Sequence, residues 1–523
     1  MRHFAFLAAA WLLLHTPSIA QAPYLNTKQT LGYLATVFTG IYPTDSCLYV
    51  KGVMTDYLLR SGLFFAKADL FGKIIWKSEL IEAGKNIYTW SPKIIKNSQD
   101  NFVVTGYVED PYRACFLAEY TPEGDLVRYG QFRNPFFPQD KFIAPLGVVQ
   151  LPSGEYLVSG NIGHYFTTKG IFLSKLSQDL EVKSTNLFGG DIFDANASIG
   201  LDSNLNVILG GMQYTNLNNK NIVCKKNILK TDSFGNPIGE WLYPPEDLPP
   251  LRGWMVKDMV VLPDGSIVGA SAIGREKVYT NNVNADLYLY PSIFKMNPDQ
   301  TLAWETPIGN GHWSVSHEMI RIVPASDGGG YVGTSSVYVV GTDVSPFKSV
   351  SLIAKVAENG DSLWTRYLYF WSDSLGDSYY HKIEDLAAAP GGEGYWLCGQ
   401  TERQVSGEPL QQGWLLHTDR YGCLSPGCQL VGTGESSLED KISLYPNPAS
   451  EYLVVHHAGH SFSKGRFSII NLRGQVLRDW AAPMDDLSTV FDVGGFPAGA
   501  YVLQYREQDE VRLSKQFLVM TSR

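Results

Sequence analysis

The sequence predicts an all-β protein made of a seven-bladed β-propeller followed by a small Ig-like antiparallel β-sandwich. Three observations support this fold class. Glycine (50), tyrosine (29) and phenylalanine (25) are abundant among the 523 residues, which favours strands and tight turns over helices. A unit of apolar strands and glycine-rich turns recurs seven times between residues 24 and 430, where helix-period patterns are nearly absent. The C-terminal part instead has short alternating segments, which are typical of a small sandwich.

The N-terminus has the pattern of a signal peptide over residues 1–20. A basic start precedes an apolar run from Phe4 to Leu14, and small residues follow at Ser18 and Ala20. The run is too short to cross a bilayer, which needs about 20 apolar residues. A buried N-terminal helix is the alternative interpretation. We expect cleavage after Ala20 and an exported mature chain without a membrane span.

The repeat unit accounts for residues 21–430. Each copy contains an apolar strand, a Gly/Ser/Asp turn, a strand that ends in a small residue, a variable loop and two further strands. Three copies are clear, and the four weaker copies have second strands near Leu48–Gly52, Phe102–Gly106, Tyr156–Gly160 and Asn206–Gly210. Four antiparallel strands repeated seven times are typical of a β-propeller, in which ring closure protects the strand edges. A pair of sandwiches is the alternative, which the regular spacing disfavours.

The last repeat lacks an apolar fourth strand, because a cysteine-bounded loop follows its third strand. Tyr24–Leu31 precede the first repeat, and we predict that they supply the missing strand. The loop is bounded by Cys423 and Cys428, the closest pair among six cysteines, which lack the C-x2-C spacing of a zinc module. In an exported protein this pair can form a disulfide. In a reducing compartment the two residues would be free thiols.

Charge and motif content exclude several function classes. The formal net charge is −10 and no long basic run is present, which disfavours nucleic acid as a partner. The pattern G-x-S-x-G is absent, and so are a phosphate-binding loop, a dinucleotide fingerprint and the paired histidines of a zinc protease. We therefore assign no catalytic residue, no cofactor and no metal ligand.

Two recurring features are interpreted as structural. The turns that begin at Asp69, Asp232 and Asn359 lack the dense carboxylates of a calcium loop. Three tryptophans share one repeat position and are expected to pack between blades: Trp76, Trp304 and Trp364. The tryptophan pattern vaguely resembles the docking repeat of quinoprotein dehydrogenase propellers, but the cofactor ligands of those proteins are missing.

An aromatic and imidazole-rich cluster is the candidate ligand site. His317 and His381 each lie fourteen residues before the tyrosine that begins a second strand, at equivalent positions of neighbouring repeats. Tyr380, Trp313 and Trp254 lie in the same crossovers, on the face that carries the long loops. Such a channel mouth suits a sugar, a peptide or a metal. The alternative is that these side chains only pack and hydrogen-bond the crossovers.

Three function classes fit this sequence. A protein that binds extracellular glycan or protein is the preferred one. An enzyme acting on polysaccharide needs two carboxyl groups about 5–9.5 Å apart. The sequence offers several acids without a means to pair them, for example Asp286, Asp343, Asp373 and Glu384. A structural surface component is the third class. Buried acids facing each other would favour the enzyme, an aromatic mouth would favour binding, and a filled channel would favour the structural role.

The C-terminal module carries three motifs in a fixed order. Residues 431–440 are polar and rich in Gly and Ser, which indicates a linker, and residues 441–523 follow as a separate module. Its motifs comprise a Y-P-N-P start, a strand followed by a glycine turn, and a P-x-G-x-Y strand. Their residues are Tyr445, Pro446, Asn447 and Pro448, then Gly474, then Gly499 and Tyr501.

These motifs closely resemble the C-terminal (type A) sorting domain of the type IX secretion system of Bacteroidetes. An ordinary carbohydrate-binding or Ig-like sandwich is the alternative. The resemblance implies passage through the periplasm and recognition of the tail by the type IX secretion machinery. It also implies release of the protein, or its attachment to the outer-membrane surface, after the tail is removed near the linker.

Overall fold

The computed structural model describes residues 24–520 with several gaps. The gaps are residues 90, 92, 111, 134–141, 165–166, 190–192, 218–220, 244–250, 254, 277–286, 310–318, 340–347, 369–378, 404–410, 425–441, 458–464, 472–473, 482–487 and 508–509. Within the described residues the regular elements are β-strands, apart from a short 3-10 turn at Pro390–Gly392. This confirms the all-β expectation. No helix of the described part is long and apolar enough to cross a membrane. The predicted signal peptide and linker lie outside the described residues.

The strands that precede the tail form antiparallel units in which neighbours along the chain pair with one another. The β2–β5 unit contains Ala35–Pro43, Leu48–Thr55, Ser61–Ala68 and Ile74–Leu80. The β6–β10 unit contains Asn86–Tyr88, Ile95–Lys96, Phe102–Asp110, Tyr112–Tyr120 and Leu126–Phe132. The β11–β14 unit contains Phe142–Gln150, Tyr156–His164, Thr167–Leu176 and Val182–Phe188. The β15–β18 unit contains Phe193–Leu201, Val207–Leu217, Asn221–Thr231 and Pro237–Tyr243.

Three further units follow the same plan. The β19–β23 unit contains Leu251–Gly253, Asp258–Val261, Ile267–Glu276, Leu287–Met296 and Leu302–Pro307. The β24–β27 unit contains Met319–Pro324, Tyr331–Val339, Lys348–Val356 and Ser362–Leu368. The β28–β30 unit contains Tyr379–Ala388, Tyr395–Arg403 and Gln411–Thr418. In β6–β10 and β19–β23 the first strand is divided into two short pieces that both pair with the second strand.

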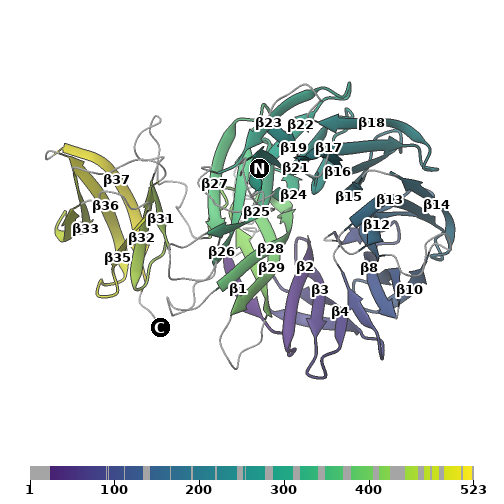
Figure 1. Ribbon diagram of the computed structural model, residues 1–523. Helices are drawn as coiled ribbons and strands as arrows, with labels where there is room; N and C mark the ends of the chain where they lie inside the picture. Colours follow the sequence, from purple (N-terminus) through teal and green to yellow (C-terminus); the bar gives the residue numbers. More distant parts are fainter. Residues whose placement is uncertain are drawn as a thin grey trace, which may run out of the picture.

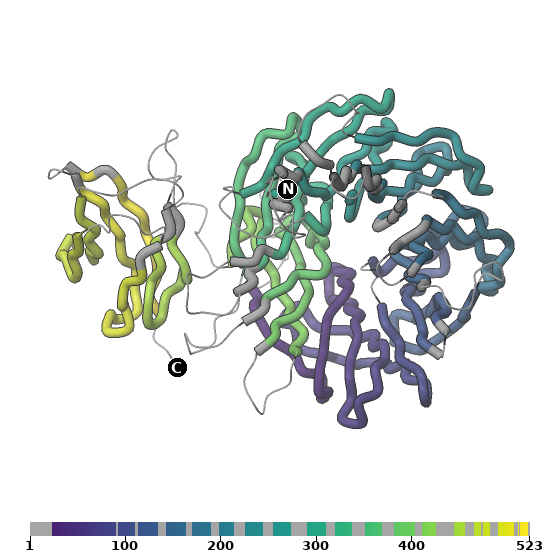
Figure 2. The backbone as a smooth tube through the Cα atoms, in the orientation of Figure 1, coloured from purple at the N-terminus to yellow at the C-terminus, as the bar shows by residue number. Residues whose placement is uncertain are grey.

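The N-terminal strand completes the β28–β30 unit, as the sequence predicts. Strand β1 (Leu25–Gln29) pairs antiparallel with β30, and Leu25 lies opposite His417. The Trp414 indole N–H donates a hydrogen bond to Asn26 Oδ1 at 2.7 Å. Figures 1 and 2 show the units following one another around a common centre, so that the last of them lies beside the first. A parallel residue pair, Ala35 with Gln411, joins β2 to β30 at this point.

A β-bulge recurs in the first strand of the units and explains the glycine that ends the apolar second-strand motif. In β2 the register shifts between Phe38 and Gly40, and β11, β15, β24 and β28 shift at the corresponding place. The bulge brings a carbonyl of the first strand against the second strand. A Cβ on Gly52 would lie 1.9 Å from the carbonyl oxygen of Val37, so only glycine fits.

The tryptophans that share a repeat position pack between units, which confirms the structural interpretation. Trp304 lies on the fourth strand of its unit and covers the turn of the next unit at Gly360, where an added Cβ would lie 2.6 Å from the indole. Its indole N–H donates to the carbonyl oxygen of Glu358 at 3.1 Å. Two further seams have the same arrangement, with Trp76 against Gly124 and Trp364 against Gly422.

In the turns between third and fourth strands, the first polar side chain of each turn accepts hydrogen bonds from the backbone of that turn. Asp69 Oδ1 accepts hydrogen bonds from the N–H groups of Phe71 and Lys73, both at 2.9 Å. Asp232 repeats the pattern in the β15–β18 unit. Because these carboxylates are engaged by backbone N–H groups, the turns have a structural role, as expected.

The tail consists of two antiparallel sheets. One sheet contains β31 (Ile442–Tyr445), β32 (Tyr452–His457) and β35 (Ser488–Asp492). The other contains β34 (Val476–Ala481), β33 (Gly465–Asn471), β36 (Gly499–Glu507) and β37 (Glu510–Val519). Side chains from both sheets share one buried core that includes Leu453, Phe467, Phe491, Tyr505 and Phe517.

Candidate functional site

Among the residues predicted at the channel mouth, His381 has a described side chain. The ring is 5% exposed and packs edge-on against Trp414, with 5.4 Å between ring centroids. The carbonyl of His381 accepts a hydrogen bond from Ser351 Oγ at 3.3 Å. His381 is therefore packed inside the protein. The remaining members of the cluster lie outside the described residues or have undescribed side chains, so their role stays a prediction: Trp254, Trp313, His317 and Tyr380.

The predicted disulfide and the predicted signal cleavage both involve residues outside the described part of the chain. Cys423 is disulfide-bonded, and its N–H donates to Asp419 Oδ1 at 2.9 Å. The predicted partner Cys428 lies outside the described residues, so that pairing stays a prediction. Cleavage after Ala20 also lies outside them. Among the cysteines with described side chains, three are buried free thiols: Cys47, Cys115 and Cys398.

The structure reveals a different polar cluster where the first strands of the units meet. We call it the central belt. Its charged members are Lys51, Lys93, Asp258, Arg321 and Asp385. Four of them are at least nine-tenths buried, and Lys93 is partly exposed. Buried charges are costly unless they are paired and hydrogen-bonded, so the partners of each side chain indicate what the belt does.

Asp385 connects three units of the belt. It follows the bulge in β28, and its carboxylate accepts a hydrogen bond from the N–H of Ile41 in β2 at 3.0 Å. Its other oxygen lies 3.4 Å from Arg321 Nε, which belongs to β24. The carboxylate therefore joins its own unit to the β24–β27 unit on one side and the β2–β5 unit on the other.

Asp258 repeats this arrangement and adds a contact across the centre. The carboxylate, on β20, accepts a hydrogen bond from the N–H of Ile322 in β24 at 3.2 Å. Lys93 Nζ lies 2.5 Å from Asp258 Oδ1. Lys93 belongs to the segment between β6 and β7, and no described strand of the β6–β10 unit pairs with the β19–β23 unit. This ion pair therefore bridges two units that are not neighbours in the succession.

Lys51 is the most deeply buried cation of the belt. Its side chain, on β3, is fully buried, and Nζ donates to Thr39 Oγ1 at 3.3 Å and to Thr89 Oγ1 at 2.6 Å. The third N–H of the Lys51 ammonium group donates to the carbonyl oxygen of Ser91. All three ammonium protons have acceptors, and these come from the β2–β5 unit and from the neighbouring β6–β10 unit.

Burial shifts the proton affinities of the belt. It raises the pKa of Asp385 to about 6, although Arg321 and the N–H of Ile41 act in the opposite direction. Burial lowers the pKa of Lys51 to about 7, which the nearby Asp385 opposes. It also raises the pKa of the Cys398 thiol. Perturbed values of this kind occur at catalytic sites and in structural ion-pair networks, and the geometry decides between them.

The contacts favour a structural network. Both buried acids accept a hydrogen bond from a backbone N–H and form an ion pair with a basic side chain. Among the described residues no group of His, Cys, Asp and Glu could hold a metal ion. The belt therefore ties neighbouring units together, and the Lys93–Asp258 ion pair adds a link between two units that do not follow one another.

Sequence reasoning missed the belt, although a signal for it exists. Asp258, Arg321 and Asp385 lie opposite the fourth residue of their second strand. A charged residue thus recurs at one position of three successive apolar strands. Aligning the repeats on their second strands would have singled out these residues.

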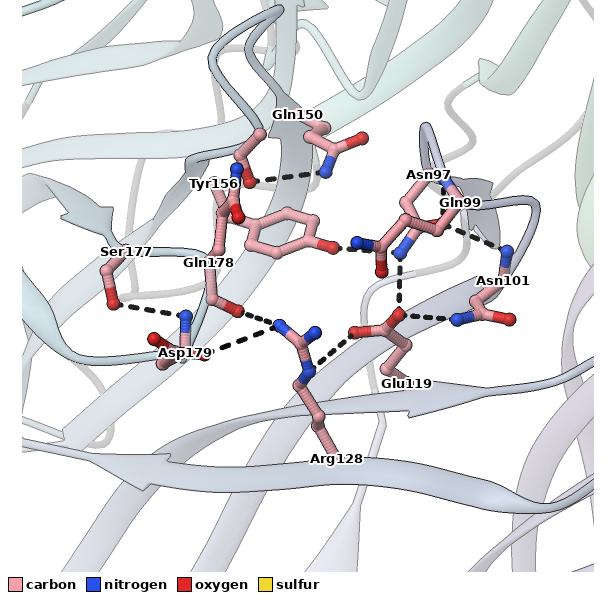
Figure 3. A network of polar contacts seen from close by, with 11 residues as sticks. Asn97, Gln99, Asn101, Glu119, Arg128, Gln150, Tyr156, Ser177, Gln178 and Asp179 are labelled. Carbon is pink, nitrogen blue, oxygen red and sulfur yellow. Dashed lines mark hydrogen bonds and ion pairs between the residues drawn. The ribbon is translucent and has the colours of Figure 1, made fainter.

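A second network joins the β6–β10 and β11–β14 units at the turn face (Figure 3). Glu119 on β9 is buried and accepts hydrogen bonds from the side-chain amides of Asn97 at 2.8 Å and Asn101 at 2.7 Å. The Asn97 amide also donates to the hydroxyl of Tyr156 at 3.1 Å, which belongs to the next unit. In the same view Arg128 reaches from β10 to the turn at Gln178.

The tail motifs have local structural roles. Asn447 Oδ1 accepts a hydrogen bond from the N–H of Leu518 at 2.8 Å, which ties the Y-P-N-P segment to the last strand. The Tyr501 hydroxyl donates to the carbonyl oxygen of Pro497 at 2.6 Å. Gly474 has a φ of 80° in the turn between β33 and β34. Peptide bonds 445–446 and 447–448 are cis.

Fold and tail together define a class of protein: an all-β chain of four-stranded antiparallel units that ends in a two-sheet tail. Residues 443–520 match the family described as secretion system C-terminal sorting domain. The tail therefore belongs to the sorting domains of the type IX secretion system, as its motifs predict. It indicates export, with secretion or attachment at the cell surface, and recognition by the type IX machinery.

Solved structures that are similar to about three quarters of the chain are distant. YCF48 bound to D1 peptide shares 10% identity at a TM-score of 0.40, covering 76% of this chain and 96% of that one. A subtype N10 neuraminidase-like protein of A/little yellow-shouldered bat/Guatemala/060/2010 shares 9% identity at a TM-score of 0.33, covering 76% of this chain and 97% of that one. The WD40 domain of SCAP from fission yeast shares 9% identity at a TM-score of 0.30, covering 77% of this chain and 99% of that one. No curated protein matches. These likenesses carry no argument about function.

Proposed function

We propose that residues 21–430 form one seven-bladed β-propeller and that residues 441–523 form an Ig-like sandwich that serves as an export address. Support comes from the repeated seam, in which a fourth strand covers the turn of the next unit, and from β1, which completes the last unit. In this proposal the signal peptide directs the chain to the periplasm. The tail then directs it across the outer membrane and is removed near residues 431–440.

The propeller is proposed to be a binding protein for extracellular glycan or protein, either released or attached to the surface. The observation that carries this proposal is the central belt. Its two acids, Asp258 and Asp385, are paired with cations and backbone N–H groups, so among the described residues neither is a free carboxylate of a catalytic pair. Ligand contacts then fall to the face with the loops between second and third strands, where binding loops on a rigid scaffold are common.

Glycan-array and surface-protein binding by the full chain tests this function. A triple variant with Trp254→Ala, Trp313→Ala and His317→Ala should lower the affinity for the selected ligand at least tenfold. The control variant carries Phe71→Ala and Phe234→Ala. These aromatic side chains are exposed at the turns between third and fourth strands, on the opposite face. Equal binding by both variants would contradict the assignment of the loop face.

A polysaccharide-active enzyme is the second candidate, because Asp385 combines burial with a pKa raised to about 6. A raised carboxyl pKa is what a general acid requires. If the propeller is an enzyme of this kind, Asp385→Asn should abolish release of reducing sugar from the bound polysaccharide. Binding without hydrolysis in the unmodified chain would exclude this function and leave the binding role.

A further inference from the structure

The hairpin tip between β3 and β4 exposes three apolar side chains in succession. Tyr57, Leu58 and Leu59 are 73%, 72% and 73% exposed. The tip connects the second and third strands of the β2–β5 unit, so it lies on the loop side of that unit. Single exposed apolar residues are ordinary on protein surfaces, whereas contiguous apolar patches are typical of contact sites. We call residues 56–60 the apolar tip.

The turn geometry of the apolar tip places Leu59 in a strained conformation. Asp56 Oδ1 accepts hydrogen bonds from the N–H groups of Leu58 and Arg60, both at 2.9 Å. Asp69 makes the same two bonds in its own turn, where the residue between the two donors is a glycine with a left-handed φ. In the apolar tip that residue is Leu59, with a φ of 62°. The tip therefore has a leucine at a position that suits glycine.

Packing within the chain does not account for this leucine. Leu180 also has a left-handed φ, but it is 8% exposed and packs against Gly130 between two units. Leu31 packs against a buried core, and Leu205 is 40% exposed. At 73%, Leu59 is the most exposed of the described leucines with a left-handed φ. A strained apolar residue that gains little from its own chain indicates a contact with another surface.

The polar groups of the apolar tip are satisfied within the tip. The N–H of Leu59 donates to the carbonyl oxygen of Asp56 at 3.0 Å, so the three successive N–H groups of residues 58–60 have acceptors there. The two charged side chains form an ion pair, in which Arg60 Nε donates to Asp56 Oδ2 at 2.8 Å. A pocket on a protein can supply hydrogen bonds to a loop, whereas hydrocarbon cannot. An internally satisfied tip therefore favours lipid over protein as the contacting surface.

We propose that the apolar tip inserts into the interface of a lipid bilayer whose headgroups carry no net charge. Leu58 and Leu59 enter the acyl region, and Tyr57 lies at the headgroup level with its hydroxyl hydrated. Arg60 is 46% exposed at the base of the tip and extends toward the phosphates. The formal net charge of −10 disfavours a strongly anionic surface, so the attraction is apolar.

The sorting tail gives this contact an occasion to form. It indicates export, with secretion or attachment at the cell surface, and attachment would keep the chain next to lipid. A weak contact then suffices, because attachment gives the tip a high effective concentration at the bilayer. The contact would fix the orientation of the β2–β5 unit on that surface. It goes beyond the proposed binding function and does not depend on it.

Co-sedimentation of the full chain with sucrose-loaded phosphatidylcholine vesicles tests the proposal. We expect half of the protein to bind at on the order of 10 mM lipid, which is weaker than binding through one acyl chain because only three side chains insert. Binding should change less than about twofold between about 0.05 and about 0.5 M NaCl, because no net charge takes part.

The double variant Leu58→Ser with Leu59→Gly should bind at least tenfold more weakly. Both side chains are exposed and glycine suits the left-handed φ, so the variant should keep its fold, which calorimetry checks. The matched control is Phe71→Ser with Phe234→Ser. It removes side chains that are 71% and 69% exposed from turns on the opposite side, and it should bind like the unmodified chain.

Several results would overturn the proposal. Absence of binding to the vesicles would do so and would leave an apolar pocket on a protein as the alternative occupant. Equal binding by the Leu58/Leu59 double variant and the unmodified chain would contradict the assignment of the tip, as would an equal loss in the control variant. Loss of binding at high salt would show that charge, and not apolar insertion, holds the chain. Because the assay contains no glycan or protein ligand, its outcome is independent of the proposed binding function.

Discussion

The pKa of Asp385 predicts an unusual pH dependence of stability. A carboxyl group whose folded pKa lies above its unfolded value takes up a proton on folding, so its contribution to stability rises as the pH falls. For Asp385 the pKa moves from 3.8 to about 6. Linkage then gives about 2–3 kcal/mol of additional stability at pH 4 relative to pH 7.

The substitution Asp385→Asn isolates this contribution, because asparagine keeps the size and an acceptor for the Ile41 N–H but does not titrate. Urea unfolding of the full chain and of the variant, followed by near-ultraviolet circular dichroism at pH 4, 5, 6 and 7, gives the difference in unfolding free energy. We expect the unfolding free energy of the unmodified chain, relative to that of the variant, to increase by about 2–3 kcal/mol as the pH falls from 7 to 4.

Asp56→Asn is the control with the opposite sign. The N–H and guanidinium groups of Arg60 lower the pKa of Asp56, so the advantage of the unmodified chain over this variant should shrink as the pH falls. A difference between the unmodified chain and Asp385→Asn that stays constant across the range would refute the reasoning. It would mean that Asp385 titrates alike in the folded and unfolded chains.

Three further perturbations test the fold. Gly52→Ala forces a Cβ to within 1.9 Å of the Val37 carbonyl oxygen, so it should lower the free energy of unfolding by about 3 kcal/mol. Urea unfolding measures this loss, and a loss below about 1 kcal/mol would contradict the close approach. Trp304→Ala removes the half-buried seam contact with Gly360 and should cost about 2 kcal/mol, measured by the same assay, whereas no loss would make the seam dispensable. Deletion of Leu25–Gln29 should lower the Tm by on the order of 10 °C in calorimetry. It should also promote association of chains through the edge of β30 that the deletion exposes. An unchanged Tm would show that β1 does not stabilise the last unit.

Sequence reasoning captured what each repeat encodes locally. The glycine at the end of the second-strand motif, the tryptophans of the fourth strands and the missing strand of the last unit all follow from patterns within one repeat or at its ends. Each has a direct counterpart in the structure, at Gly52, Trp304 and β1.

The central belt could not be derived in the same way, because its pairs join residues far apart in the chain. The acids that the sequence offers as candidates include Glu384, which pairs with Lys382 at 2.7 Å. The bulge in β28 shifts the strand by one residue at this point, so the neighbouring Asp385 enters the belt. Alternation along a strand cannot show such a shift. The pairing of Lys93 with Asp258 depends in turn on how the units are arranged around the centre.

The pairing of β1 with β30 has a consequence for the order of folding. The bond between Trp414 and Asn26 joins residues that are 388 positions apart. Bringing together the ends of a loop of that length costs about 5 kcal/mol of chain entropy, and the cost falls when intervening units are already formed. We therefore expect the clasp between the two ends to form last, after the third strand of the final unit has been synthesised. Folding of this part of the chain therefore cannot be completed until β30 has been synthesised.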